Sequence, residues 1–496
     1  MIAAAVMAVA VAGAVAPALS VTAGVRPPGA GDVLAAMGTV QAAGSWGTAI
    51  EVPGLGALNK GGNAEVTSVS CASAGNCAAG GFYTDGDGHG QGFVAGERNG
   101  TWWAAIEVPG LGVLNKGGNA EVTSVSCASA GNCAAGGFYT DSSRHQQAFA
   151  AGERRGRWSM AIEVGPAVYN AHLWAAVNAV SCPSAGNCVG GGYYTDPGEY
   201  NQAFVVSERD GTWGPAIQLP FTGNAYYPNG YGTLNSLSCT SVGNCAAGGY
   251  DNGQAAVNTI ESAFVVDEKN GHWGKVRQVP GMAALNTGSP NVYSVSCASE
   301  GNCAAGGKYL DHSDHFQAFV VSENNGTWGK AIKVPGSSAL NSRGSALVGS
   351  VSCASAGNCA AGGAASSRNG VGALVVSEKH GTWGKAIAVQ GPGSLFGGRN
   401  AEVRSVSCAT ARNCVAGGDS KDSSLRAQAV VVSERAGTWG RAIEVPGTSV
   451  LNVGGSADVT AVSCAPGGGC AAVGGYRDST GATQGFVVSQ NRNMIR

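Results

Sequence analysis

The chain has 496 residues, of which 44% are hydrophobic and only 12% are charged, and its formal net charge is −2. This apolar content is too high for a disordered chain. No basic run stands out, which argues against nucleic acid as a partner. Glycine is abundant, with 81 residues. It recurs at fixed places in a repeat, so it marks turns and close packing rather than low complexity.

The N-terminus has an apolar core followed by small residues, which is typical of a secretory signal peptide. We expect residues 1–23 to be this signal, with cleavage after Ala23, and residues 24–43 to be a flexible N-terminus. The alternative is a membrane anchor, but the apolar run is short and is broken by Gly13 and Pro17. The sequence therefore predicts a secreted, extracellular protein with no membrane span after cleavage.

The cysteines come in eight local pairs, each within a unit such as VSCASAGNCAAGG at residues 69–81. First cysteines of successive pairs lie 55 to 58 residues apart. A C-x5-C pair without a histidine or a second pair at fixed spacing is a poor zinc site, whereas local pairs suit an oxidising compartment. We therefore expect eight disulfides, which join Cys71 to Cys77, Cys127 to Cys133, Cys182 to Cys188, Cys239 to Cys245, Cys297 to Cys303, Cys353 to Cys359, Cys408 to Cys414, and Cys464 to Cys470.

Each repeat contains four strand-like segments, which we call A, B, C and D. In the first repeat they are residues 64–71, 77–83, 91–97 and 101–108. Short strands at regular spacing with turn signals between them indicate an all-β fold. The cysteine turn joins A to B. Segments C and D meet at Asn-Gly or Asp-Gly in several repeats, and these dipeptides are the preferred two-residue hairpin turns.

The two ends of the repeat array complement each other. Residues 45–52 form a D segment with no A, B or C before it, and the last repeat has A, B and C with no D after them. A circular array needs this arrangement, and closure removes exposed sheet edges. The sequence therefore predicts an eight-bladed β-propeller of four-stranded antiparallel blades over residues 44–490. It is closed by the N-terminal strand, and residues 491–496 follow as a tail.

Aromatic residues recur from repeat to repeat and are expected to fill the space between blades. They are tryptophans at the start of D and phenylalanines in C: Trp46, Trp102, Trp158, Trp213, Trp273, Trp328, Trp383, Trp439, Phe93, Phe149, Phe204, Phe264, Phe319 and Phe486. Sugar stacking by the tryptophans is the alternative, but a residue present in every blade usually serves the common fold.

In such a propeller the A–B and C–D turns share one face, and the B–C and D–A loops share the other. The loops of the second face vary most, and loops on a rigid scaffold carry function more often than the scaffold. The most distinctive loops belong to blades 3 and 4, where aromatic residues favour stacking on sugar faces. The candidate ligand-binding residues are Tyr169, His172, Trp174, Tyr194, Tyr200, Tyr226, Tyr227 and Tyr231. The alternative is that these side chains only order their own loops.

Two B–C loops contain residues that bind divalent metals in other proteins. They are Asp311-His312-Ser313-Asp314-His315 and Asp85-Gly86-Asp87-Gly88. An aspartate after segment B recurs in most repeats, however, which is more consistent with a turn cap. We expect no metal and no other cofactor.

The C–D segment VVSERDGTWG at residues 205–214 resembles the Asp-box hairpin of sialidase-type propellers. It is one residue shorter between Ser207 and Trp213 than that pattern, and the resemblance carries no catalytic residues. Over residues 45–490 the chain resembles secreted bacterial repeat proteins with SCxSxGNCxAGG units. That resemblance implies a propeller and an extracellular location, with no assigned chemistry.

The sequence leaves three hypotheses for function. The first is a secreted, monomeric, non-enzymatic propeller that binds a carbohydrate or a cell-surface protein through the variable loop face. The alternative is a propeller-type glycoside hydrolase, sialidase-like, or a lyase, which requires at least two carboxylates that converge near the central opening. The third is a purely structural surface protein.

Overall fold

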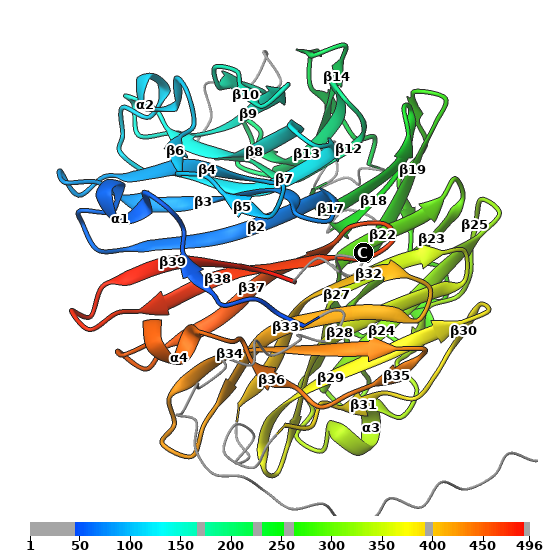
Figure 1. The fold of residues 1–496 in the computed structure, drawn as a ribbon. Coiled ribbons are helices and arrows are strands. Elements are labelled where there is room, and N and C mark those ends of the chain that lie inside the picture. Colours follow the sequence, from blue (N-terminus) through cyan, green and yellow to red (C-terminus); the bar gives the residue numbers. More distant parts are fainter. Residues whose placement is uncertain (1–44, 166–173, 222–230, 252–261, 392–399, 491–496) are drawn as a thin grey trace, which may run out of the picture. The chain divides into compact units, whose positions relative to one another are not determined.

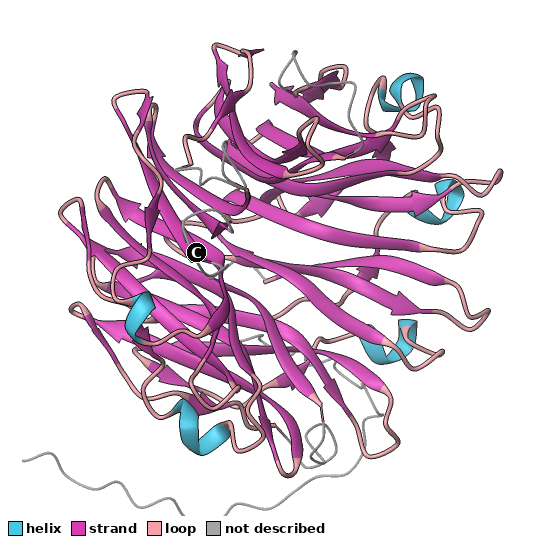
Figure 2. Ribbon diagram, turned by 180° about the vertical axis from the view of Figure 1, so that it is seen from behind, coloured by secondary structure: helices cyan, strands magenta, loops and turns pink. Residues whose placement is uncertain are grey.

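The computed structural model describes residues 45–165, 174–221, 231–251, 262–391 and 400–490. All of them belong to one compact unit, Ala42–Arg496. They form eight antiparallel sheets arranged as the blades of a propeller, which confirms the predicted fold (Figure 1). Strands make up most of this unit, and its short helices lie in loops (Figure 2).

The strands of each blade follow the predicted A–B–C–D order, with A at one edge and D at the other. The A strands are β2 (Ala64–Ser73), β7 (Ala120–Ser129), β12 (Ala175–Ser184), β17 (Gly232–Ser241), β22 (Gly288–Ser299), β27 (Ala346–Ser355), β32 (Ala401–Thr410) and β37 (Ala457–Cys464). The B strands are β3 (Asn76–Thr84), β8 (Asn132–Thr140), β13 (Asn187–Thr195), β18 (Asn244–Asp251), β23 (Asn302–Leu310), β28 (Asn358–Ser367), β33 (Asn413–Lys421) and β38 (Cys470–Arg477). The C strands are β4 (Gly90–Arg98), β9 (Gln146–Arg154), β14 (Asn201–Arg209), β19 (Ser262–Lys269), β24 (Phe316–Asn324), β29 (Gly370–Lys379), β34 (Ala427–Arg435) and β39 (Thr483–Ser489).

The predicted continuous D strand is wrong in detail, because each complete D segment is two short strands that both pair with strand C. The pairs are β5 (Thr101–Trp102) with β6 (Ile106–Glu107), β10 (Arg157–Trp158) with β11 (Ile162–Glu163), β15 (Thr212–Trp213) with β16 (Ile217–Gln218), β20 (His272–Trp273) with β21 (Arg277–Gln278), β25 (Thr327–Trp328) with β26 (Ile332–Lys333), β30 (Thr382–Trp383) with β31 (Ile387–Ala388), and β35 (Thr438–Trp439) with β36 (Ile443–Glu444). The break has a tertiary cause. Between β5 and β6 the backbone N–H of Ala105 donates to Pro53 O of the preceding blade, at 2.7 Å, instead of to strand C.

The D–A loops contain one-turn helices that the sequence analysis did not anticipate. They are α1 (Leu55–Leu58), α2 (Leu111–Leu114), α3 (Ser337–Leu340) and α4 (Thr448–Leu451), with a 3-10 turn, η1, at Met282–Ala284. Each follows a glycine with positive φ, such as Gly54 at 75°. The first residue of each turn is buried, so the turns anchor the loops to the blades.

The ring is closed by the N-terminal segment, as predicted. Strand β1 (Ile50–Glu51) pairs with β39 of the last blade, where Ile50 lies opposite Val487. A bridge between Trp46 and Gln490 extends this pairing. The eighth blade is therefore built from both ends of the described chain.

The hydrophobic core lies between blades. One cluster, for example, joins Val94 of blade 1 to Phe149 of blade 2, and the phenylalanines of strand C are fully buried. Close approach needs glycine: a Cβ on Gly80 would lie 2.5 Å from a methyl carbon of Val122 in the next blade. The predicted packing role of the recurring phenylalanines is confirmed, and the tryptophans are buried or pack against these clusters.

The A strands form the inner ring, because each one hydrogen-bonds to the A strand of the next blade. The serine before the first cysteine of one blade accepts a hydrogen bond from the backbone N–H of the first cysteine in the next. This bond occurs at all eight seams, at 2.8–3.0 Å: Ser70 to Cys127, Ser126 to Cys182, Ser181 to Cys239, Ser238 to Cys297, Ser296 to Cys353, Ser352 to Cys408, Ser407 to Cys464, and Ser463 to Cys71.

All sixteen cysteines are disulfide-bonded in the predicted pairs. Each bridge crosses the A–B turn of its blade, so it fastens two neighbouring strands rather than two blades. Local disulfides in such number are typical of an oxidising compartment. In the part of the chain that the structure describes, no helix is long and apolar enough to cross a membrane.

Candidate functional site

The A–B and C–D turns lie together on one face, which we call the uniform face. In blade 1 the backbone N–H of Asn99 donates to Asn76 Oδ1 at 3.2 Å, and that of Gly100 donates to Gly75 O at 2.9 Å. The same asparagine clamp joins the two turns in seven blades, at 3.1–3.4 Å. In the eighth blade Gly469 replaces the asparagine. The repeated Gly-Asn-Cys motif is therefore structural.

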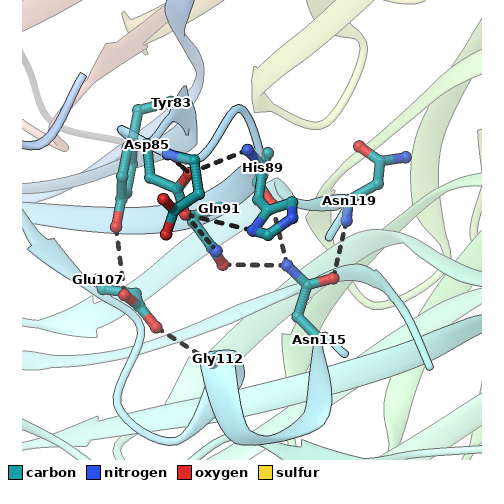
Figure 3. A network of polar contacts seen from close by, with 10 residues as sticks. Tyr83, Asp85, His89, Gln91, Glu107, Gly112, Asn115 and Asn119 are labelled. Atoms are coloured by element: carbon teal, nitrogen blue, oxygen red, sulfur yellow. Dashed lines mark hydrogen bonds and ion pairs between the residues drawn. The ribbon is translucent and has the colours of Figure 1, made fainter. Parts of the chain in front are cut away.

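The B–C loops on the opposite face, which we call the variable face, are capped by an aspartate. Asp85 Oδ1 accepts hydrogen bonds from the backbone N–H groups of Asp87 and His89, and Oδ2 accepts one from Gln91 Nε2, each at 2.9 Å (Figure 3). Burial raises the pKa of Asp85, but the bonds from Gln91, His89 and Asp87 outweigh it and hold this pKa below its usual value. The carboxylate is thus held ionised as a cap.

This cap recurs and confirms the turn-cap interpretation of the sequence. The aspartates that accept bonds from two backbone N–H groups and from a glutamine on strand C are Asp85, Asp141, Asp196, Asp311, Asp422 and Asp478. Asp85, Asp87 and His89 do place three ligand atoms within 4.8 Å of one another. Because the cap already uses both oxygens of Asp85, this geometry needs no metal to explain it.

The cap also connects neighbouring blades. Asn115, after α2 of blade 2, donates from Nδ2 to Gln91 Oε1 at 3.0 Å and to Gly90 O at 2.9 Å, and its Oδ1 accepts from the Asn119 backbone at 2.9 Å (Figure 3). Asn59, Asn341 and Asn452 make the corresponding pair of bonds at three other seams. The variable face is therefore regular at four seams, and its distinct chemistry must lie elsewhere.

The loops around blades 3 and 4 depart from this pattern. Gln202, which caps Asp196 in blade 3, also accepts a hydrogen bond from Gln218 Nε2 of its own blade at 3.0 Å. Segments 166–173, 222–230 and 252–261 of these loops lie outside the described residues. The candidate residues Tyr169, His172, Tyr226 and Tyr227 fall in them.

Three described aromatic residues of blades 3 and 4 form one group. Tyr200, on the B–C loop of blade 3, meets Tyr231 of blade 4 edge-on with ring centroids 6.2 Å apart. Tyr231 in turn lies 6.3 Å from Tyr250, on β18. We call Tyr200, Tyr231 and Tyr250 the blade 3–4 aromatic cluster. Trp174, at the start of β12, is 54% exposed, and Tyr200 is 37% exposed.

Among the described candidate residues, Tyr194 differs from the others because its side chain is buried in the blade. Its side chain is 3% exposed and packs against Phe204 with ring centroids 6.4 Å apart. The same position is a buried tyrosine in other blades, such as Tyr83 and Tyr309. Tyr194 is thus part of the repeated core, because side chains alternate along strand B and this one points into the blade interface.

The residue before this buried position is the one that sequence reasoning missed. It is Tyr193 in blade 3, where Gln146 Nε2 donates to the hydroxyl at 3.5 Å, and Tyr250 in blade 4, where Thr233 Oγ1 donates to the hydroxyl at 3.2 Å. Burial raises the pKa of Tyr193. The available signal was that this position, after Gly-Gly of strand B, changes identity from blade to blade, as Lys308 and Asp419 also show.

Carboxylates gather on the inner strands of blades 7, 8, 1 and 2. Arg404 lies between two of them, with Nη2 3.1 Å from Asp419 Oδ1 and Nε 3.7 Å from Asp458 Oδ2. Burial, then Asp458 and Glu121, raise the pKa of Glu65 to about 7, although Arg404 acts in the opposite direction. Strands A and B therefore carry acidic groups in these four blades, whereas strand B carries Tyr193 in blade 3 and Tyr250 in blade 4.

No protein-family model and no curated protein sequence matches the chain. Among solved structures, it is similar to Sqt1 from Chaetomium thermophilum, with a TM-score of 0.50 and 13% identity over 90% of this chain and 100% of that one. A polysaccharide lyase of the ulvan lyase family PL25 follows with a TM-score of 0.42, at 9% identity over 72% of this chain and 89% of that one. The Hadza microbial sialidase Hz136 has a TM-score of 0.37, at 10% identity over 89% of this chain and 68% of that one. At these identities the comparison with Sqt1 supports the propeller fold alone.

Proposed function

We propose that this protein is a secreted, monomeric, non-enzymatic propeller that binds a glycan or a cell-surface protein through its variable face. The observation that carries the proposal is the blade 3–4 aromatic cluster, with the exposed ring of Trp174 on the same blades. Eight disulfides support an extracellular location, since such bonds persist in oxidising compartments.

A carbohydrate suits this surface chemically. Partly exposed aromatic rings stack on the apolar faces of sugars, and nearby hydroxyl and amide groups hydrogen-bond to sugar hydroxyls. Tyr200 and Tyr231 supply rings, and the hydroxyl of Tyr250 supplies a polar group in the same cluster. Sqt1 has been solved with the N-terminus of a ribosomal protein, L10, which shows a propeller engaged with a protein segment. A protein partner is therefore kept within the proposal.

The test is a glycan array together with a cell-wall pull-down, using wild type, Trp174→Ala and Tyr231→Ala. We expect binding to fall at least tenfold in both variants, since a lost stacking contact costs about 1–3 kcal/mol. Trp103→Ala is the matched control, because Trp103 is 60% exposed on the outer edge of blade 1, away from the site. Equal binding by all four proteins would exclude this surface.

The glycoside hydrolase or lyase is not favoured. It required carboxylates near the central opening, and Glu65 and Asp458 of the inner ring do interact. These groups lie on neighbouring blades along one arc, however, and Arg404 ties Asp458 into an ion-pair network. Such a network accounts for the carboxylates without a bound sugar between an acid and a nucleophile. A hydrolase assay on any glycan that binds would separate the two hypotheses.

A further inference from the structure

In seven blades the last residue but one of strand C is a buried glutamate. These residues are Glu97, Glu153, Glu208, Glu268, Glu323, Glu378 and Glu434. At two adjacent seams the preceding blade supplies its hydrogen-bond donor. Ser322 Oγ donates to Glu378 Oε1 at 2.6 Å, and Ser377 Oγ donates to Glu434 Oε1 at 2.7 Å. The same hydroxyls accept from the indole N–H of Trp383 and Trp439, both at 2.9 Å. One serine hydroxyl thus accepts a hydrogen bond from a tryptophan and donates one to a glutamate.

The seam between blades 4 and 5 breaks this rule. Asp267 occupies the serine position and accepts the indole N–H of Trp328 on Oδ1, at 3.0 Å. Glu323, which is 3% exposed, therefore faces a carboxylate instead of a hydroxyl donor. Glu323 Oε1 and Asp267 Oδ2 are buried without a hydrogen-bond partner. Both residues line a cavity of about 10 Å³, which has room for about one water molecule.

A second substitution in the same blade compensates part of the charge. The outer D strand carries isoleucine at this position in the other seven blades, and arginine in blade 4. Arg277 Nη2 lies 3.7 Å from Asp267 Oδ2. The ion pair balances the charge of Asp267, so Glu323 is the group left without a donor. A buried acceptor in this position is costly unless it keeps its own proton.

The other charged groups around the seam do not remove this conflict. Lys269 and Arg277 lower the pKa of Glu323, but burial and then Asp267 raise it further, to about 7. Glu268 and Glu300 also line the cavity and add negative charge. Glu268 is turned to the preceding blade, where Arg209 lies 3.8 Å from its Oε1, and His272 acts on Glu268 rather than on Glu323.

We propose that Glu323 keeps a proton in mildly acidic medium, where its O–H donates a hydrogen bond to the carboxylate of Asp267. It loses this proton to solvent near neutral pH, so that the seam between blades 4 and 5 is a pH-sensitive joint. In the protonated state the O–H of Glu323 replaces the serine hydroxyl that serves Glu378 and Glu434 at the next two seams. In the ionised state two buried carboxylates face each other, and the seam admits water. Only the proton moves, between Glu323 and solvent. The inference is independent of the proposed ligand.

The test is hydrogen–deuterium exchange of peptides that cover β19 and β24, at about pH 5.5 and about pH 8, with rates corrected for the intrinsic pH dependence of exchange. In the wild type we expect the corrected rate to rise about tenfold or more at the higher pH, because each unit by which a pKa is raised corresponds to about a factor of ten. In Glu323→Gln this rise should disappear. The control Glu378→Gln, at the serine-containing next seam, should leave the rise at β19 and β24 intact.

A second variant tests the same proposal if Glu323→Gln does not fold. Asp267→Ser combined with Arg277→Ile rebuilds the serine and isoleucine found at the next two seams, and it should also abolish the pH-dependent rise. Infrared difference spectra between wild type and Glu323→Gln should show the carbonyl band of a protonated carboxylic acid at about pH 5.5 and not at about pH 8. The proposal is overturned if the band is missing at the lower pH, or if both variants keep the wild-type rise in exchange rate. It is also overturned if a metal chelator, without a change of pH, produces the same rise in exchange rate.

Discussion

The hydroxyl of Ser463 in the last blade accepts a hydrogen bond from the backbone N–H of Cys71 in the first blade, at 2.9 Å. The two residues are 392 positions apart, yet the bond is the one that joins every other pair of neighbouring blades. The closing seam is therefore built like the other seven at this position. It differs two residues earlier in strand A, where most seams have a second serine bond.

Ala461→Ser is expected to strengthen the closing seam. At six seams a second serine accepts from a valine N–H, as Ser68 does from Val125 at 3.0 Å. Ala461 has no hydroxyl to offer Val69. A new hydrogen bond of this kind should raise the free energy of unfolding by about 1 kcal/mol. Urea denaturation at equilibrium measures it.

Ala179→Ser, at the seam between blades 3 and 4, should give a similar gain by offering a hydroxyl to Leu237. The matched loss is Ser405→Ala, which removes the bond to Val462 and should cost about 1 kcal/mol or more, since a buried N–H is left unpaired. A stability unchanged by all three substitutions would show that these ladder bonds contribute nothing.

Ala436→Asn is expected to stabilise the C–D turn of blade 7. Ala436 has φ of 49°, the same left-handed conformation that Asn99 adopts in blade 1 with φ of 51°. A residue with a Cβ pays about 1 kcal/mol for this conformation, and asparagine tolerates it better. The thermal midpoint should rise, whereas Asn99→Ala should lower it. A fall with Ala436→Asn would contradict the assignment of strain to this turn.

Removal of one disulfide should weaken the fold only modestly. The bridge between Cys353 and Cys359 spans six positions, so it closes a small loop, and the double replacement by alanine should cost about 2 kcal/mol. Urea denaturation gives the change, and intact mass before and after reduction confirms that seven bridges remain. Complete unfolding of this variant would mean that a bridge acts across the seam as well as within its blade.

Glu65 should make the protein less stable as the pH rises. Its pKa is raised from 4.5 to about 7 in the fold, first by burial. Between these two values the folded state binds more protons than the unfolded chain, so this stability is full below about pH 4.5 and is lost as the pH rises through about 7. Glu65→Gln should therefore stabilise by about 1–2 kcal/mol at about pH 8 and have little effect at about pH 4.5. Chemical denaturation at both pH values measures the effect.

Arg404→Gln should act in the opposite sense to Glu65→Gln, because Arg404 lowers the pKa of Glu65. If Glu65→Gln gave the same change at both pH values, the carboxyl group would be ionised throughout.

The candidate site was only partly visible in the sequence. The variable loops pointed to Trp174, Tyr200 and Tyr231, because unusual aromatics in irregular loops stand out against a repeat. Tyr250 was not singled out from the sequence, whereas Tyr194, which the structure buries, was, because they occupy neighbouring positions of two similar strands. Which of two adjacent tyrosines faces the buried seam depends on the register of strand B against strands A and C.

The sequence by itself determined the blade count, the strand order, the disulfides and the circular closure, because these follow from local signals: two-residue periodicity, turn dipeptides, and cysteines six positions apart. Only the tertiary structure determined which residues of neighbouring blades contact each other. The division of strand D, the serine-to-cysteine ring and the hydrogen bond from Trp328 to Asp267 all join residues of different blades, about 50 or more positions apart. Such contacts depend on how one sheet packs on the next, and no local pattern encodes that distance.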